Sequence, residues 1–213
     1  MDAQTNILKH DSKLKSRMFH FGLSLGLNKS QYKFTPSSEL YSSESISSIS
    51  SPYGPGFQVG IISNVRINDH FDLRFIPTLA FSERSLEYEH FADSTATKTI
   101  EGVNLNFPLH IKFKSNPYHD FRFYAIAGVS GLYDVASNAK ARKNKDLVKV
   151  KAGDIALEYG VGMELHFEFF TLSPEFKVSH GLTNVVVPEQ LIYTRVLDKL
   201  LSRTFYFTLH FEG

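Results

Sequence analysis

Apolar and polar residues alternate with a period of two along most of this chain, and that pattern constrains the fold more than any other feature. The run VNLNFPLHIKF at 103–113 places its apolar side chains on one face of a strand and Asn, Pro, His and Lys on the other. The run FHFGLSLGLN at 19–28 has an apolar face opposite a face built mostly from Gly and Ser. Small residues suit a crowded interior better than a wet surface, so we expect the polar face to line a narrow lumen and the apolar face to meet lipid.

Composition agrees with this interpretation and excludes several classes of protein. The 213 residues suit one domain, and 42% of them are hydrophobic. No apolar stretch approaches the roughly 18 residues of a transmembrane helix. The 23 basic and 22 acidic residues produce no net field that would attract nucleic acid. With no cysteine, disulfides, thiolate metal sites and thiol nucleophiles are excluded.

The spacing of the alternating runs predicts eight strands, an even number that closed membrane barrels allow. The connections alternate between long (30–55, 85–98, 134–153 and 183–202) and short (69–70, 114–120 and 169–170), as in barrels with long outer loops and short periplasmic turns. The expected strands are 18–29, 56–68, 71–84, 99–113, 121–133, 154–168, 171–182 and 203–211.

We therefore predict an all-β fold, an eight-stranded antiparallel transmembrane β-barrel with long extracellular loops and short periplasmic turns, in the outer membrane of a diderm bacterium. Residues 18–213 form the barrel domain, and 1–17 are a flexible periplasmic segment. A barrel must cross the inner membrane with a signal peptide, and 1–17 has no apolar core for one. We expect a removed signal and an added Met1. The alternative fold is a soluble lipocalin-like barrel, whose interior is apolar.

The inward-facing positions are expected to hold charges of both signs. An unpaired charge is costly in a closed lumen, so these side chains are expected to form ion pairs across it. An eight-stranded barrel is just wide enough for its own side chains to fill, which predicts a plugged interior and disfavours an open pore. The predicted lumen charges are Arg66, Asp72, Arg74, Lys112, Arg122, Asp154, Glu158, Glu164, Glu175 and Lys177.

Four histidines, His20, His110, His166 and His210, also face inward by the same alternation. A metal site or a proton-sensing cluster is one interpretation, because neutral imidazole binds metals and titrates near neutral pH. No spacing motif of metal ligands supports it, so hydrogen-bonded packing is the preferred one. We expect no metal and no cofactor.

No catalytic motif is present in the sequence. G-x-S-x-G, H-E-x-x-H and Gly-rich phosphate loops are all missing. Enzymes do occur on this architecture, so the fold alone does not exclude catalysis. A lipid-modifying enzyme would need a convergent polar cluster at the outer end of the barrel, which the sequence does not display. The stretch SSELYSSESISSISSPYGPG, from Ser37, is Ser-rich and is expected to be a mobile outer loop.

Two other outer loops have the composition of contact surfaces. The segment SNAKARKNKDLVKVK at 137–151 is strongly basic and suits lipopolysaccharide phosphates or an acidic partner, the alternative being a solvated loop. The segment PEQLIYTRVLDKLLSR at 188–203 has apolar residues at helical spacing after a Pro-Glu start, which predicts an amphipathic helix that caps the barrel or docks a partner. The candidate contact residues are Lys140, Arg142, Lys143, Lys145, Ile192, Val196, Leu197 and Leu200.

Several runs resemble the PorT (SprT) family of outer-membrane β-barrels. They are SNAKARKN, DLVKVKAGDIALEYGVGME, LSPEFKVSHGLTN, LIYTRVLDKLLSR and the closing FYFTLHFE, with weaker likeness in NLNFPLHIKFKS and FRFYAIAGVSGLYD. The likeness spans 18–212, is most specific in the second half, and supplies no catalytic residue.

The resemblance implies a non-enzymatic assembly or accessory factor of the type IX secretion system, which also supports gliding motility in some bacteria. The partners it implies are other secretion-system proteins, beside outer-membrane lipids and lipopolysaccharide. We expect a monomeric barrel with no nucleic-acid partner. The alternative is a generic small outer-membrane barrel for adhesion or envelope integrity.

Overall fold

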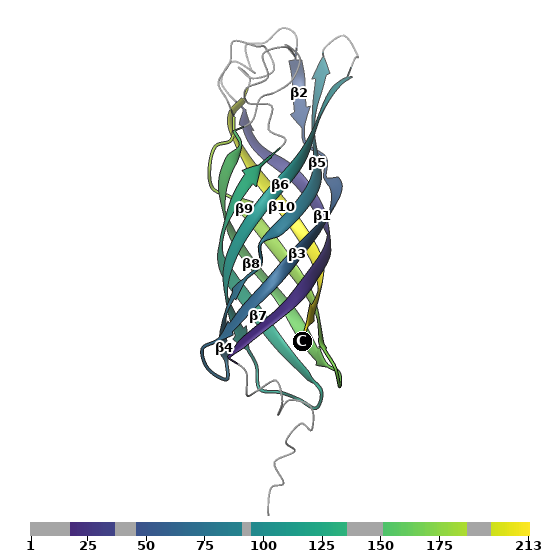
Figure 1. Cartoon of the computed structure of the whole chain (residues 1–213). Coiled ribbons are helices and arrows are strands. Elements are labelled where there is room, and N and C mark those ends of the chain that lie inside the picture. Colours follow the sequence, from purple (N-terminus) through teal and green to yellow (C-terminus); the bar gives the residue numbers. More distant parts are fainter. Residues whose placement is uncertain (1–17, 37–45, 91–94, 136–150, 187–196) are drawn as a thin grey trace, which may run out of the picture.

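The computed structural model describes residues 18–36, 46–90, 95–135, 151–186 and 197–213 (Figure 1). These residues form one antiparallel sheet that curves into a tall barrel with strongly tilted strands. Among them, no helix is long and apolar enough to cross a membrane. The strands are β1 (Phe19–Pro36), β2 (Ile46–Ser50), β3 (Gly54–Arg66), β4 (Phe71–Phe75), β5 (Thr78–His90), β6 (Thr95–Lys114), β7 (Phe121–Asp134), β8 (Gly153–His166), β9 (Thr171–Gly181) and β10 (Leu197–Glu212).

The sheet closes on itself because β1 pairs with β10 on one side and with β3 on the other. The remaining order, from β10 through β9, β8, β7 and β6 to β4 and β3, completes the ring. A closed ring leaves no unpaired edge in the wall, which a lipid environment requires. The predicted antiparallel barrel is therefore confirmed.

The described residues form ten strand segments instead of the eight expected, for two local reasons. β4 and β5 occupy one position in the ring, since both lie between β3 and β6. From the pair Ser63–Phe75 to the pair Gly60–Thr78, both strands advance by three residues, so no residue is inserted. Pro77 has no N–H to donate, and this interrupts the ladder. The tenth segment, β2, pairs with β5 beyond the ring and is part of the Ser-rich stretch that was expected to be a loop.

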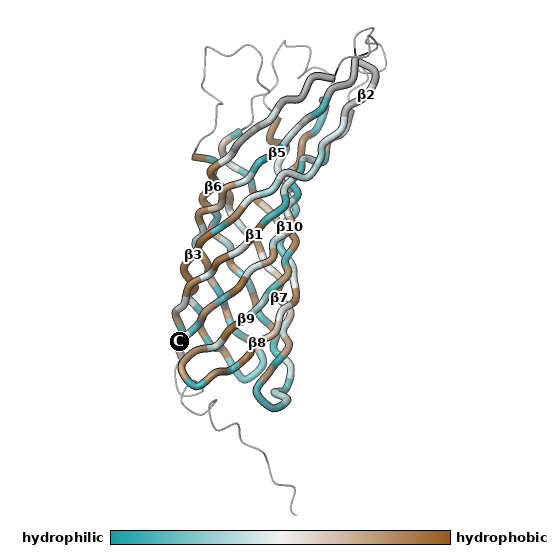
Figure 2. The backbone as a smooth tube through the Cα atoms, turned by 90° about the vertical axis from the view of Figure 1, so that its right-hand side faces the viewer, coloured by the Kyte–Doolittle hydropathy of each residue, from teal (hydrophilic) through white to brown (hydrophobic). Residues whose placement is uncertain are grey.

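Hydrophilic and hydrophobic residues alternate along the strands of the wall, as the sequence pattern predicts (Figure 2). On β1, Phe21, Leu23 and Leu25 are largely exposed on the outside, while His20 and Ser24 are buried inside. The same division holds on β6, where Leu109 and Ile111 face out and His110 is completely buried. The outside of the barrel is thus an apolar belt and the inside is polar, the inverse of a lipocalin-like barrel.

The strands are longer at the outer end than predicted. β1 continues to Pro36, and β5 and β6 pair as far as Glu89 and Thr95, so most of the loop expected at 85–98 is a hairpin. About 9–11 residues suffice for a tilted strand to span a bilayer, whereas β6 has 20. The β5–β6 hairpin, with β2 on its edge, therefore extends beyond the apolar belt (Figure 1).

The helix predicted over the last loop is wrong at its C-terminal end. β10 begins at Leu197 and pairs with β1 from that residue onward, so Leu197 and Leu200 lie in a strand. Leu200 is completely buried beside Ser202 and Thr204 on the inner face and is not a contact surface. The apolar residues of LDKLLSR fit both the spacing of an amphipathic helix and the alternation of a strand. Backbone pairing with β1 selects the strand. Ile192 and Val196 lie outside the described residues.

Gly128 marks a place where two strands approach closely. A Cβ atom built there would lie 2.1 Å from the carbonyl oxygen of Leu109 and 2.8 Å from Cα of His110, both backbone atoms of β6. We expect Gly128→Val to lower the free energy of unfolding by about 1–3 kcal/mol, because β6 must shift to admit it. The matched control is Gly131→Val on the same strand, where a Cβ would meet nothing within 4 Å. Equal urea midpoints for the two variants would contradict this account.

Candidate functional site in the lumen

Arg74 lies at the centre of the charged interior. β4 places its side chain in the lumen, where it is completely buried. Its two terminal nitrogens reach different strands: one is 3.1 Å from the Glu175 carboxylate on β9 and the other 2.8 Å from Glu212 on β10. The guanidinium thus bridges the barrel from one wall to the other. Charge-assisted hydrogen bonds of this kind are stronger than neutral ones and also hold the guanidinium in one orientation.

Tyr124 joins this pair to a second one. Its hydroxyl donates to Glu175 at 2.9 Å, and its ring lies beneath the Arg74 guanidinium at 5.3 Å and the Lys112 ammonium at 4.2 Å. Lys112 in turn forms an ion pair with Glu164 of β8. The ring therefore contacts two cations, each of which also pairs with carboxylates.

A third cluster is centred on Glu158, which has only 1% of its side chain exposed. One of its oxygens is 2.7 Å from Nε2 of His110 and 2.7 Å from the ammonium of Lys177. The Lys177 ammonium also lies 4.8 Å from the ring centroid of Tyr206. With these contacts β6, β8, β9 and β10 are tied together across the lumen.

The periplasmic end of the lumen is closed by a smaller group. The Lys114 ammonium is 2.5 Å from Asp72, whose other oxygen accepts a hydrogen bond from Asn64 at 3.0 Å. Arg66 and His166 help to line the adjoining cavity of about 40 Å³. That space holds a few water molecules at most.

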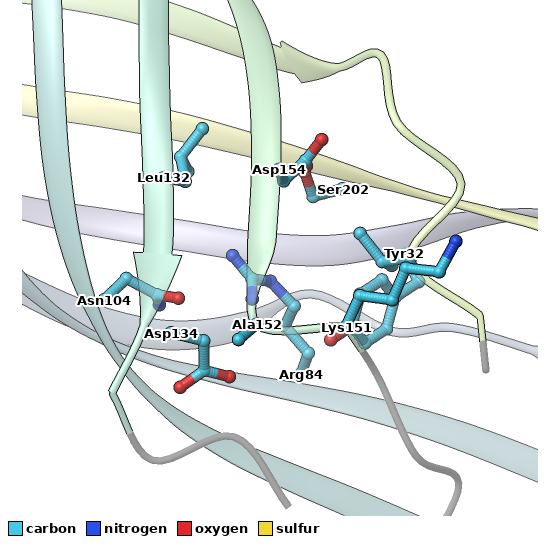
Figure 3. Close-up of a pocket in the computed structure, with 10 residues that line it drawn as sticks. Tyr32, Arg84, Asn104, Leu132, Asp134, Lys151, Ala152, Asp154 and Ser202 are labelled. Carbon is cyan, nitrogen blue, oxygen red and sulfur yellow. The ribbon is translucent and has the colours of Figure 1, made fainter. Parts of the chain in front are cut away.

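The outer mouth holds a polar pocket of about 30 Å³ (Figure 3). There the Ser202 hydroxyl donates to Asp154 at 2.5 Å, and the other Asp154 oxygen accepts from the Thr183 N–H at 3.1 Å. Arg84 lies over the ring of Tyr32, 5.4 Å from its centroid. Asp134, Lys151 and Asp154 also line this pocket, and no histidine is among the described residues that do. The two hydrogen bonds of Asp154 join β8 to β10 and to Thr183 at the outer mouth.

The side chains expected in the lumen are all found on its inner side. Arg66 and Asp154, near the two ends, are half-buried, and the others are buried. Arg122 lies opposite Glu164 in the register of β7 and β8. The four candidate basic contacts, Lys140, Arg142, Lys143 and Lys145, lie outside the described residues.

Sequence reasoning missed several members of the network, among them Lys114, Glu212 and Tyr124. Lys114 and Glu212 are two residues beyond Lys112 and His210 and therefore face inward with them. The predicted strands ended one residue before Lys114 and one residue before Glu212. Tyr124 shares the parity of Arg122 and was available from the same pattern. Extending each run by one residue and counting tyrosine would have found all three.

The four inward histidines do not form one cluster, although His20 and His166 line the same cavity. His110 contacts Glu158, His166 is 3.9 Å from Glu164, and His210 is 3.4 Å from Glu175. In the described part of the chain, no group of three or more His, Asp and Glu side chains could hold a metal ion. Each of these three histidines therefore lies beside a different carboxylate.

Comparison with known proteins agrees with this architecture. The profile of the family described as Outer membrane protein beta-barrel domain matches residues 3–187. OprG from Pseudomonas aeruginosa superposes with a TM-score of 0.50 at 11% identity, over 91% of this chain and 92% of that one. Neisserial surface protein A (TM-score 0.48, 12% identity, 91% and 96% covered) and Ail of Yersinia pestis (0.38, 12%, 92% and 100%) are more distant in shape. No curated protein matches the sequence.

Proposed function

Since this chain belongs to the outer-membrane protein β-barrel domain family and lies in the outer membrane, we propose that it is a non-conducting, non-enzymatic barrel that serves adhesion or envelope integrity. The observation that carries this is the filled lumen. Arg74, Lys112, Lys114, His110 and Glu158 are among the largest side chains that are completely buried, and their contacts join different strands across the lumen. A lumen filled in this way leaves the outer surface as the working part of the molecule.

The outer extension supports a surface role. The β5–β6 hairpin with β2 extends beyond the apolar belt, where it meets solvent and other molecules. At its base the outward residues become polar, with Glu83 following the apolar Phe81 and Leu79 on β5. A paired hairpin offers a stiffer contact surface than a loop of equal length.

The test is a hairpin-shortened variant, in which residues 86–98 are replaced by a tight turn between the paired residues Ser85 and Thr99. The wall below this pair remains complete, so we expect the shortened barrel to assemble normally. Cells that carry it should lose surface attachment or resistance to bile salts to the same extent as a strain that lacks the gene. Full activity of the shortened barrel in both assays would overturn the proposal.

The second candidate is an accessory role in type IX secretion. It is favoured by the likeness of 146–164, 172–184 and 191–203 to the PorT family, and a closed lumen suits a component that is not the translocation pore. In a deletion strain, this candidate predicts that cargo with a C-terminal sorting domain stays in the periplasm and is released on re-expression. Normal secretion would eliminate it and leave the first candidate standing.

A further inference from the structure

An apolar groove of about 470 Å³ lies on the outside of the barrel wall, near its outer end. Its walls come from β1, β9, β10, the start of β3 and Tyr53, the residue that precedes β3. Leu27, Phe176 and Phe207 line it and face outward, each about half exposed or more. The groove therefore opens toward lipid.

Three aromatic side chains hold the groove open. The ring of Phe205 lies 5.6 Å from that of Tyr53 and 6.2 Å from that of Phe176. Gln31 donates a hydrogen bond of 2.7 Å to the Tyr53 hydroxyl, which fixes that ring at the outer rim. The groove is thus shaped before any ligand arrives, and its apolar walls suit a hydrocarbon chain.

Basic side chains occupy the same face, with Lys29 in the groove lining and others beyond its outer end. On β1 the outward apolar run ends at Leu27 and is followed by the exposed Lys29 and Lys33. Arg203 is next to Gln31 in the register, and its guanidinium lies 5.2 Å from the centroid of the Phe205 ring at the rim. β1 contains no acidic residue. Cations and aromatic rings at the edge of an apolar belt lie at the level of lipid headgroups.

We propose that this groove binds a phosphorylated, acylated glycolipid of the outer leaflet, of the lipid A type. One acyl chain lies along Phe205 and Tyr53, and a phosphate lies between Lys29, Lys33 and Arg203. A neutral lipid would leave the three cations without an anion. A second copy of this chain docked face to face would bring the same cations together. This binding is independent of the function proposed above.

The first test uses the full-length barrel in detergent and native mass spectrometry, with diphosphoryl lipid A and its dephosphorylated form as probes. We expect the wild type to retain the diphosphoryl form at least tenfold more tightly, because each basic residue near a lipid phosphate contributes several-fold. Equal retention of the two probes, or equal retention of phosphatidylglycerol, would overturn the proposal without any variant being needed.

The second test changes the protein. Lys29→Gln with Arg203→Gln should weaken binding of diphosphoryl lipid A about tenfold or more, whereas Lys151→Gln, an exposed lysine at the outer end of the neighbouring wall, should not. Phe205→Ala should also weaken it, and Phe123→Ala, exposed on β7 away from the groove, should not. The heat-dependent gel shift of a folded barrel checks assembly of each variant. Equal binding by the groove variants and their controls would contradict the assignment.

Discussion

Replacing Arg74 by methionine is expected to lower the free energy of unfolding of the barrel by about 3–5 kcal/mol, because two buried carboxylates lose their shared cation. Glu175 and Glu212 remain in a lumen where their side chains are only 2% and 8% exposed. Water cannot replace the guanidinium there without disrupting the packing around Tyr124. The loss should appear as a lower urea midpoint by circular dichroism and by the heat-dependent gel shift.

Two controls separate this effect from the loss of a large side chain. Phe75→Met changes the next residue of the same strand on its lipid-facing side and should cost little. Arg74→Met combined with Glu175→Gln and Glu212→Gln removes the buried charges together and should recover most of the stability. If the triple variant were as unstable as Arg74→Met, packing and not charge would be the cause.

Placing an arginine at Leu23 is expected to cost about 2–4 kcal/mol, because this position is in the middle of the apolar run of β1 and faces the hydrocarbon core. Leu23 is 59% exposed in the protein alone, so its surroundings are lipid. A soluble barrel would tolerate the same change with almost no effect.

A second outward position on β1, closer to the membrane surface than Leu23, provides the control. Leu27 faces the same way but is the last apolar residue before Lys29, at the headgroup level. Leu27→Arg should therefore cost only about 0–1 kcal/mol. Unfolding of both variants from phospholipid vesicles would measure the difference. Equal costs at the two positions would contradict the assignment of the apolar belt to the membrane.

The period of two predicted much of the wall, including which side chains face inward. Arg74, Glu158 and Glu175 could be assigned to the lumen from parity alone, because every residue of a closed sheet faces one side or the other. Which carboxylate each cation contacts depends on how far the strands are staggered around the barrel, and on side chains from strands that are far apart in the sequence. Arg74 reaches Glu175 and Glu212 across the barrel, and no local pattern encodes that pairing.

The outer end was predicted less well because two physical signals compete there. Above the membrane the outward residues become polar, so the alternation fades although β1 and the β5–β6 hairpin continue. At LDKLLSR the apolar residues fit a helix as well as a strand, and only pairing with β1 decides between them. The groove beside Phe205 depends on Tyr53, a residue between strands, and was not foreseen.

The most direct test of the closed lumen is the conductance of the purified barrel in a planar lipid bilayer. The ion pairs of Arg74, Lys112 and Glu158 fill the interior, so we predict no stable conducting level for the wild type, while a porin prepared in the same way conducts. Steady, reproducible channels from the folded wild-type barrel would contradict the filled lumen and the proposed function that rests on it.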